Sequence, residues 1–558
     1  MNQSRYFYYL LFICCALFST PLVTAFDAFD DLVSFADSDA GAELINNTTF
    51  NVVRAPSKQA IIAILDELDF FPLLQENIFL RTNILRSRSL LDYPDFIPWR
   101  HDRDKRAIYI DLFYNQTSRM FFNKDSGNIC TYLAVTSPSF IATIDKILDN
   151  ARKAGFIQAA DQDKYLQLIN LFQTFTVQER RFGLMIGGKT TINRWQLHIM
   201  APWYYLERNH FVDEKVQEDL QALTADIFGA PQTPEEIARA EKLQHEFEDN
   251  YLIADKFGIG DTRVYCDYPI IKKKYLSTRL GFLATIPTAF AMKKGLKGSS
   301  FERVQFPELL NLQELVDAAL IAQQNGTPIA DVQAFDYALD VLSNLSAMLL
   351  EAPMGNGGHL GLGGYIRNRS PLSSFIKQDW ARLIYMRSFI SLEYLFPATE
   401  WRSFRVPVNE TLFNERDLTN IEDQAIINSN YEFILQQLND RLFPRVFQTK
   451  VYPGFIFRWS SQFCYETDTA GFTFGTDTYV RNKESLNPRC APAIARHIID
   501  ITHAECPLSY QSKICAQAFY KITKPDQLWT VGLIGDYTFM NKGIGADYML
   551  ALKAHVMF

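Results

Sequence analysis

The last sixteen residues of the chain, Gly543 to Phe558, alternate between apolar and polar side chains up to a terminal aromatic residue. The apolar series is Ile544, Ala546, Tyr548, Leu550, Leu552, Ala554, Val556 and Phe558, and the other series includes Asp547, Lys553 and His555. Because side chains of a β-strand point alternately to opposite faces, this segment predicts a strand with one apolar and one polar face. Either the core of a soluble protein or the acyl chains of a membrane could cover that apolar face.

The other end of the chain indicates export. Arg5 precedes an apolar stretch from Tyr6 to Phe18, which is followed by the small-residue sequence Val23-Thr24-Ala25. This pattern predicts a secretory signal, residues 1–25, cleaved before Phe26. The alternative is an N-terminal membrane anchor, for which the apolar stretch is short.

Composition narrows the class further. Beyond the N-terminal segment there is no uncharged apolar run of about 18 residues, which a transmembrane helix would need. Yet 48% of the chain is hydrophobic, with 44 Phe and 26 Tyr. An exported, aromatic-rich chain without a spanning helix is typical of a transmembrane β-barrel. The net charge of −8 offers no basic surface for nucleic acid.

Alternation elsewhere in the sequence completes a barrel. We expect an all-β, antiparallel membrane barrel of about twelve strands in residues 106–558, with strands near 106–123, 181–191, 194–207, 256–270, 275–289, 357–368, 380–396, 447–465, 470–483, 513–523, 529–539 and 544–558. Pro202 counts against the third strand because proline removes a ladder hydrogen bond. Long helical insertions are expected at 138–172, 214–251, 307–350 and 414–442, where apolar residues recur at three and four. Residues 26–105 form a mixed segment, periplasmic or lumenal, without an assigned role.

Strand parity predicts the orientation of the barrel. With both termini in the periplasm, the short connections at 192–193, 271–274, 466–468 and 524–525 share the periplasmic side, and the insertions face outside. If residues 513–523 are instead helical and residues 128–135 form the missing strand, the insertions move to the periplasm.

The polar parity of these strands predicts which side chains face the lumen. A charged side chain on the lipid face costs about 2 to 4 kcal/mol at the membrane midplane for Arg or Lys, so charges belong inside. Both signs occur in similar number, which fits either a network that partly plugs the barrel or a weakly selective passage for polar solutes. The candidates are Asp111, His198, Asp261, Arg263, Asp267, Arg279, Arg387, Glu393, Arg458, Asp477, Lys521, Asp536, Asp547 and Lys553.

The chain resembles the outer-membrane β-barrel proteins of Gram-negative-type bacteria in its signal, its alternating strands and its terminal Phe558. The resemblance implies that Tyr548, Leu550, Leu552, Val556 and Phe558 form the signal read by the barrel assembly machinery. The hairpin "GIGDTRVYCDY" and "LGFLATIPTA" is also similar to one in channel barrels of the phenol-degradation-gene and hydrophobic-substrate transporter families. These resemblances imply a passive porin or substrate channel in contact with outer-membrane lipid. The alternative is a surface or assembly protein whose barrel anchors partner-binding loops.

No pattern in the sequence indicates catalysis, a cofactor or a metal. The glycine-rich run from His359 to Tyr365 leads into a strand, so it cannot present helix N–H groups to a phosphate. His198 is the one wall histidine near mid-strand, and no serine partner is evident for it. We therefore expect no enzyme.

Six cysteines remain after signal cleavage, and none forms a C-x-x-C pair. We expect Cys266 to face lipid as a free thiol. The candidates for disulfides, in any of three connectivities, fall in or beside the external loops and are Cys130, Cys490, Cys506 and Cys515.

Overall fold

The computed structural model describes residues 106–119, 121–122, 125–126, 138–153, 176–211, 253–273, 275–294, 354–374, 376–404, 423–442, 445–488 and 498–558. It also describes short pieces within 62–71, 162–167, 219–222 and 406–418. The expected signal and nearly all of the mixed segment 26–105 lie outside the described residues.

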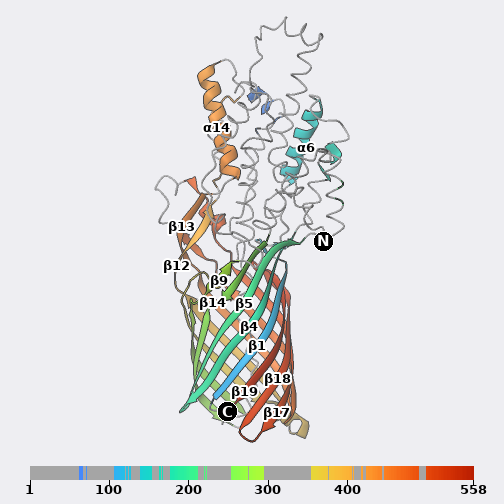
Figure 1. Ribbon diagram of the computed structural model, residues 1–558, viewed down its shortest axis with the longest axis vertical. Coiled ribbons are helices and arrows are strands. Elements are labelled where there is room, and N and C mark those ends of the chain that lie inside the picture. Colours follow the sequence, from blue (N-terminus) through green and yellow to red (C-terminus); the bar gives the residue numbers. More distant parts are fainter. Residues whose placement is uncertain are drawn as a thin grey trace.

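Twelve antiparallel strands close into a barrel (Figure 1). Each strand pairs with the next around the ring, and β19 pairs with β1 to close it. The strands, in order, are β1 (Arg106–Arg119), β4 (Thr176–Ile192), β5 (Trp195–Phe211), β7 (Thr262–Lys273), β8 (Leu276–Ile286), β10 (Gly361–Pro371), β11 (Ile384–Leu395), β14 (Gly454–Glu466), β15 (Ala470–Arg481), β17 (Ser509–Lys524), β18 (Gln527–Lys542) and β19 (Ala546–Met557).

All twelve expected strands are therefore confirmed, although their ends shift and two of the expected segments each contain two strands. The strand expected over 256–270 is two, β6 (Ile253–Ile259) and β7, and the strand expected over 447–465 is β13 (Arg445–Tyr452) and β14. Trp380 lies in a 3-10 turn, η4 (Asp379–Arg382), which follows η3 (Leu372–Ser374) and precedes β11.

Pro202 lies inside β5 at the point where this strand changes partner. Residues 196–200 of β5 pair with β7, and residues 203–209 pair with β6. Between them the carbonyl of Pro202 accepts a hydrogen bond of 2.8 Å from the amide of Gly260. The missing N–H of proline is tolerated here because the ladder on this side is interrupted in any case.

The short connections between strands lie together at one end of the barrel, beside Arg106 and the C-terminus, where Ala107 pairs with Met557 (Figure 1). We call this the short-turn end. The expected segment 513–523 is part of β17, so the arrangement with the short turns together is confirmed. The inverted arrangement required residues 513–523 to be helical, which is wrong, and residues 128–135, on which it also relied, lie outside the described residues.

The opposite end, which we call the insertion end, carries few described helices: α6 (Pro138–Lys153), α14 (Gln424–Leu442) and α16 (Ile501–Ala504). It also carries a small sheet of β12 (Ala398–Phe404), β13 and β16 (Ser485–Asn487), the strand β9 (Phe290–Lys294) on β6, and the pair β2 (Phe121–Phe122) and β3 (Asp125–Ser126). Long helices throughout all four insertions are not supported, since 307–350 and most of 214–251 lie outside the described residues.

None of the helices in the described part of the chain is long and apolar enough to cross a membrane.

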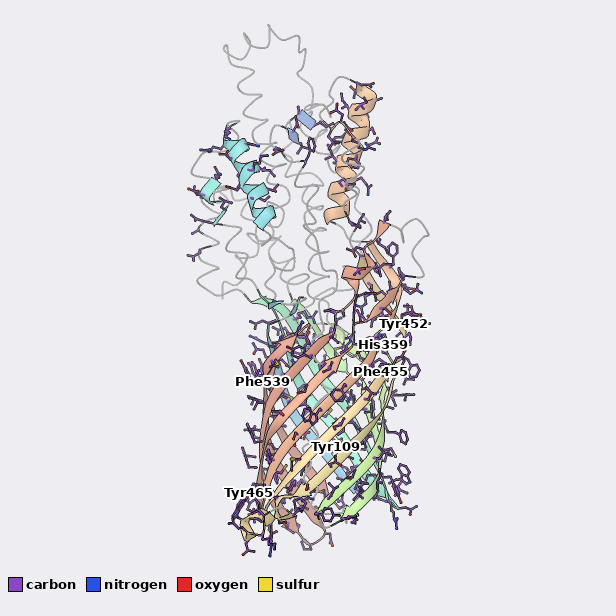
Figure 2. The ribbon with its side chains drawn as sticks, turned by 180° about the vertical axis from the view of Figure 1, so that it is seen from behind. Tyr109, His359, Tyr452, Phe455, Tyr465 and Phe539 are labelled. Atoms are coloured by element: carbon purple, nitrogen blue, oxygen red, sulfur yellow. The ribbon has the colours of Figure 1, made fainter. Side chains whose placement is uncertain are left out.

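The outer surface of the barrel is an apolar band between two groups of aromatic side chains. Phe282, Leu533 and Leu552 in this band are each more than half exposed. Exposed Trp195 and Trp529 lie near the short-turn ends of β5 and β18. Tyr465 also lies near the short-turn end, and Phe455 and Phe539 lie towards the insertion end (Figure 2). From Trp529 to Tyr537 the strand rises roughly 26 Å at about 3.3 Å per residue, or about 20 Å along the barrel axis at a tilt of about 40°. This is the surface of a transmembrane barrel.

Aromatic rings lie flat against the inner wall where the neighbouring strand has a glycine. A Cβ atom on Gly187 would lie 2.1 Å from the ring of Tyr109, and one on Gly281 would lie 2.4 Å from the ring of Tyr365. Glycine at these two positions therefore lets a large ring occupy the wall of the next strand.

Candidate functional site: the interior of the barrel

The interior of the barrel carries all fourteen side chains expected to face it. Thirteen of them are buried, and the side chain of Arg279 is 11% exposed. From Phe455 to Glu466 on β14 and from Ala470 to Val480 on β15 buried and less buried residues alternate, as they do when one face lines an interior and the other meets lipid.

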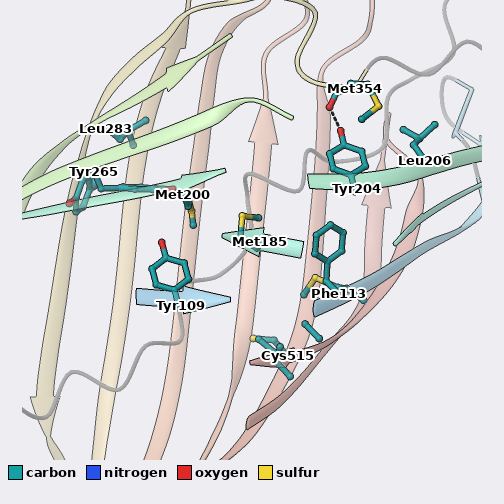
Figure 3. Close-up of a cluster of buried hydrophobic side chains, with 14 residues drawn as sticks. Tyr109, Phe113, Met185, Met200, Tyr204, Leu206, Tyr265, Leu283, Met354 and Cys515 are labelled. Atoms are coloured by element: carbon teal, nitrogen blue, oxygen red, sulfur yellow. Dashed lines mark hydrogen bonds between the residues drawn. The ribbon is translucent and has the colours of Figure 1, made fainter. Parts of the chain in front are cut away.

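Apolar and aromatic side chains fill the middle of this interior (Figure 3). The buried members of this central cluster come from nine of the twelve barrel strands and include Phe113, Met185, Tyr204 and Ile534. Each of these four is at most 3% exposed. A water-filled passage would expose the side chains that line it, so the barrel is closed at this level in the described conformation.

One member of the central cluster does not come from the wall. Met354 belongs to residues 354–359, the inner loop, which enters the barrel from the insertion end before β10 begins (Figure 3). The Tyr204 hydroxyl donates a hydrogen bond to the carbonyl of Met354. Two amides at this level, those of Asn356 and Ala289, donate to the Asp261 carboxylate at 2.6 and 3.3 Å.

The inner loop depends on glycine and is tied to the insertion end by a histidine. A Cβ on Gly355 would lie 2.5 Å from the Asp261 carboxylate and from Ala289. The ring of His359 makes hydrogen bonds through Nδ1 to the carbonyl of Phe396, at 2.8 Å, and through Nε2 to Glu400, at 2.9 Å. Gly355 therefore shapes a loop inside the barrel, a role that alternation along the strand did not reveal, while the glycine-rich run from His359 to Tyr365 leads into β10 as expected.

Between the central cluster and the insertion end, acids and bases form short pairs. Glu179 lies between Arg181 and Arg208, at 2.5 Å from each guanidinium. Arg458 donates to Asp477 at 2.8 Å, and Arg263 pairs with Glu393 at 3.0 Å.

A fourth group at this level crosses three neighbouring strands. Lys513 on β17 lies 2.9 Å from Asp536 on β18 and 2.9 Å from Asp547 on β19. Asn115 and Thr538 also donate to Asp547, each at 2.9 Å. Every carboxylate in these groups thus has a cation within 3 Å.

Towards the short-turn end each carboxylate serves several partners. Asp267 accepts a hydrogen bond of 2.7 Å from Tyr365 and contacts the guanidinium groups of both Arg279 and Arg367. Asp111 lies 2.9 Å from His555 and 3.9 Å from Lys553.

The third carboxylate of this half, Glu466, accepts a hydrogen bond of 2.6 Å from Tyr385 and pairs with Lys521. Two arginines cover the same tyrosine ring, Arg369 at 4.1 Å and Arg387 at 5.0 Å from its centre. Arg387 also donates to the Tyr385 hydroxyl at 2.8 Å.

His198 contacts aromatic residues. Its Nε2 is hydrogen-bonded to the Tyr109 hydroxyl, and its ring stacks on Tyr265 with 5.6 Å between the ring centres. In the part of the chain that the structure describes, no group of three or more His, Cys, Asp or Glu side chains is arranged to hold a metal ion.

Sequence reasoning missed several inward charges. Glu179, Arg208 and Arg369 show how, since the observed strands extend past the expected ends at 181, 207 and 368. Continuing the polar parity to the true strand ends would have found all three. Among the described residues, the inward charged side chains that were missed are Glu179, Arg181, Lys189, Arg208, Arg367, Arg369, Glu466, Arg481 and Lys513.

A polar cluster outside the membrane joins the small sheet to the barrel rim. Glu484 accepts hydrogen bonds of 2.9 Å from the Cys506 amide and 2.7 Å from Arg481, and it lies 3.2 Å from Arg402. Burial alone would raise the pKa of Glu484, but the guanidinium groups of Arg402 and Arg481 hold this pKa below its ordinary value. Burial raises the pKa of the Cys506 thiol to about 11, and Glu484 adds to that rise.

The structure changes the expectation for the cysteines. Cys506 and Cys515 carry thiols, and Cys130 and Cys490 lie outside the described residues. The placement of Cys515 beside a loop is wrong, because it lies within β17 and its side chain is buried in the central cluster. Cys266 is a free, half-buried thiol on the outward parity of β7.

The inward and outward parities of the last strand are as expected from its sequence. Leu550, Leu552 and Phe558 are about half exposed, and Met557 is 4% exposed. The amide of Phe558 donates a hydrogen bond of 3.0 Å to the carbonyl of Arg106, so the final residue still takes part in barrel closure.

No protein-family model matches the chain, and no curated protein matches its sequence. Solved barrels align with it at low similarity. An outer membrane channel from Pseudomonas putida F1 is 6% identical over 81% of this chain and 95% of its own, with a TM-score of 0.36. The toluene transporter TodX of Pseudomonas putida is 5% identical over 86% and 96%, at 0.28, and the transport unit of the Escherichia coli autotransporter AIDA-I is 4% identical over 84% and 95%, at 0.29. Similarity at this level says nothing about what the chain carries.

Proposed function

We propose that the protein is a passive outer-membrane channel for small polar solutes, closed in the described conformation by the central cluster and the inner loop. The short-turn end lies in the periplasm in this proposal, and the insertion end faces outside. Its role includes no catalysis and no cofactor.

The observation that carries the proposal is the polar character of the barrel wall above and below the central cluster. Buried ion pairs are seldom more stabilising than well-packed apolar side chains of similar volume. A barrel that served only to anchor partner-binding insertions could therefore fill its interior with apolar residues. Instead each half of this interior carries charged side chains that could replace the hydration of a polar solute.

The inner loop supplies a means of opening. Met354 enters the central cluster from a segment that is not part of the wall, so it can withdraw without breaking a strand pairing. Its contacts are the hydrogen bond from Tyr204 to its carbonyl and the packing of its side chain.

The outer face supports the remaining parts of the proposal. The apolar band contacts outer-membrane lipid, and the alternation of Tyr548, Leu550, Leu552, Val556 and Phe558 is the assembly signal read by the barrel assembly machinery. Heat-modifiable migration on gels and a strand-dominated circular dichroism spectrum in detergent identify the folded barrel for every experiment below.

Conductance of the purified, folded protein in a planar lipid bilayer tests the proposal. We expect discrete conductance steps, and we expect Met354→Ala to raise the open probability because it removes side-chain volume from the closed level. Phe282→Ala is the matched control, since Phe282 is 67% exposed on the lipid face and should leave conductance unchanged. A folded wild type and a folded Met354→Ala variant that both fail to conduct would contradict the channel.

A further inference from the structure

The inward charges of the barrel divide unevenly between its two halves. Among the described side chains, three inward carboxylates lie within six residues of the short-turn end of their own strand, namely Asp111, Asp267 and Glu466. The described inward cations in the same half are seven, namely Lys189, Arg279, Arg367, Arg369, Arg387, Lys521 and Lys553.

The half towards the insertion end is balanced. Its six inward cations are Arg181, Arg208, Arg263, Arg458, Arg481 and Lys513. Its six inward carboxylates are Glu179, Asp261, Glu393, Asp477, Asp536 and Asp547. The whole chain has a net charge of −8, so the cationic excess is a local property of one half of the interior.

Two of these cation pairs lie directly opposite each other in the strand register. Arg279 on β8 faces Arg367 on β10, and Arg369 on β10 faces Arg387 on β11. Like charges in directly opposed positions destabilise a sheet. Asp267 contacts both members of the first pair.

The second pair shares a tyrosine ring and a single described carboxylate. Arg369 and Arg387 both lie over Tyr385. Glu466 attracts both guanidinium groups, pairs with Lys521 and accepts a hydrogen bond from the Tyr385 hydroxyl, so one acid serves three cations. Guanidinium groups recognise oxyanions through paired N–H donors, and an aromatic ring can hold them in position. An oxyanion between the two arginines would relieve their repulsion.

The short connections at this end of the barrel also carry an excess of positive charge. Exposed cations in the short connections are Arg194, Lys272, Lys273, Lys377, Arg382 and Lys524, against exposed Asp379, Asp468 and Asp526. A cleft of one sign with low-dielectric walls concentrates ions of the opposite sign.

We infer that the channel selects anions, and that Arg369 and Arg387 bind the oxyanion group of a small solute, a carboxylate or a phosphate, inside the short-turn end. This inference rests on the proposed channel function and specifies its solute class. The balanced half lets either sign pass, and the cationic half decides between them.

The reversal potential across a bilayer with a tenfold KCl gradient tests this selectivity. We expect the wild type and Met354→Ala to pass chloride severalfold better than potassium. The double variant Arg369→Gln/Arg387→Gln should move the reversal potential towards zero, and Arg369→Lys/Arg387→Lys should keep it. Arg458→Gln/Asp477→Asn is the matched control because it removes one buried pair and leaves the net charge unchanged.

Acetate and inorganic phosphate, added in turn on the short-turn side, identify the oxyanion. We expect one or both to reduce the chloride current of the wild type, with the effect weakened at least severalfold in the Arg→Gln double variant and retained in the Arg458→Gln/Asp477→Asn control. Conducting channels that prefer potassium, or an Arg→Gln variant with unchanged selectivity and block, would overturn this inference alone. Folded protein without conductance in any variant would overturn the channel itself.

Discussion

The two halves of the barrel interior are made by the same twelve strands and handle buried charge in different ways. In the half towards the insertion end, pairs such as Arg458 and Asp477 match cation to carboxylate at 2.8 Å. In the short-turn half, arginines oppose arginines across neighbouring strands, and one carboxylate serves two of them. The first arrangement minimises the cost of burying charge, whereas the second keeps a field of one sign.

This difference indicates where selectivity lies. In the half towards the insertion end each cation is matched by a carboxylate, so this half is polar but nearly neutral. The short-turn half retains an excess of cations, so in the proposed channel a permeating ion meets its strongest discrimination there. In the same proposal the central cluster, which separates the two halves, controls whether an ion passes.

Stability measurements should separate the halves most strongly. Glu179→Gln leaves Arg181 and Arg208 buried beside a neutral side chain, and breaking a buried pair typically costs about 3 to 5 kcal/mol. Arg369→Gln removes a like-charge opposition on β10, and we expect a change of about 1 kcal/mol or less. Urea unfolding of both variants in lipid vesicles checks this order, and equal losses would remove the contrast between the halves.

The next largest loss of stability is expected from overpacking the barrel wall in the short-turn half. Gly281→Ala would place a Cβ 2.4 Å from the Tyr365 ring and 2.7 Å from Asp267. We expect a loss of about 1 to 3 kcal/mol, as for other overpacked sites. Gly364→Ala is the matched control, because its Cβ would lie 3.7 Å from the carbonyl of Gly281, an ordinary van der Waals contact. Similar thermal stability of the two variants would show that the ring of Tyr365 can move away.

The last strand offers a test of which side chains face lipid and which face the interior at the short-turn end. Phe558→Ala should lower the amount of barrel that reaches the membrane, yet leave the folded fraction nearly as stable as the wild type. Met557→Ala should lower the stability of the folded barrel and leave the amount that reaches the membrane nearly unchanged, because Met557 is buried inside the barrel and Phe558 is 52% exposed. Folded yield in an outer-membrane fraction and the unfolding temperature of the purified barrel measure the two effects. Matching yields for the two variants would contradict the assembly signal.

The smallest effect concerns the polar cluster of Glu484, Arg402, Arg481 and Cys506 at the barrel rim. This cluster continues the paired charges of the half towards the insertion end. With a thiol pKa of about 11 and 5% exposure, Cys506 should react slowly with maleimide at pH 8, where only about a thousandth of such a thiol is ionised. Because burial raises this pKa, the rate should increase as the pH rises towards 11. Glu484→Gln should speed the reaction by loosening the cluster. Fast labelling of the wild type at pH 8 would show that the rim is open.

Much of the wall could be read from the sequence. Every one of the twelve strands follows from alternation, because a barrel strand meets lipid on one face and the polar interior on the other along its whole length. The same parity placed Asp111, Arg263 and Asp547 inside. The sequence placed Cys515 beside a loop, whereas it lies well inside β17. Alternation shows which face a residue is on, but the ends of a strand are set by its pairing with neighbouring strands.

The sequence by itself thus determined the class of fold, the number of strands and the face of each wall residue, because these depend on a period of two residues along the chain. Only the tertiary structure decided which charges meet. The opposition of Arg369 and Arg387 depends on the register between strands, and the closure by Met354 depends on a loop that enters the barrel from its end. Register and loop path are settled by contacts between residues far apart in the chain, and local alternation carries no record of them.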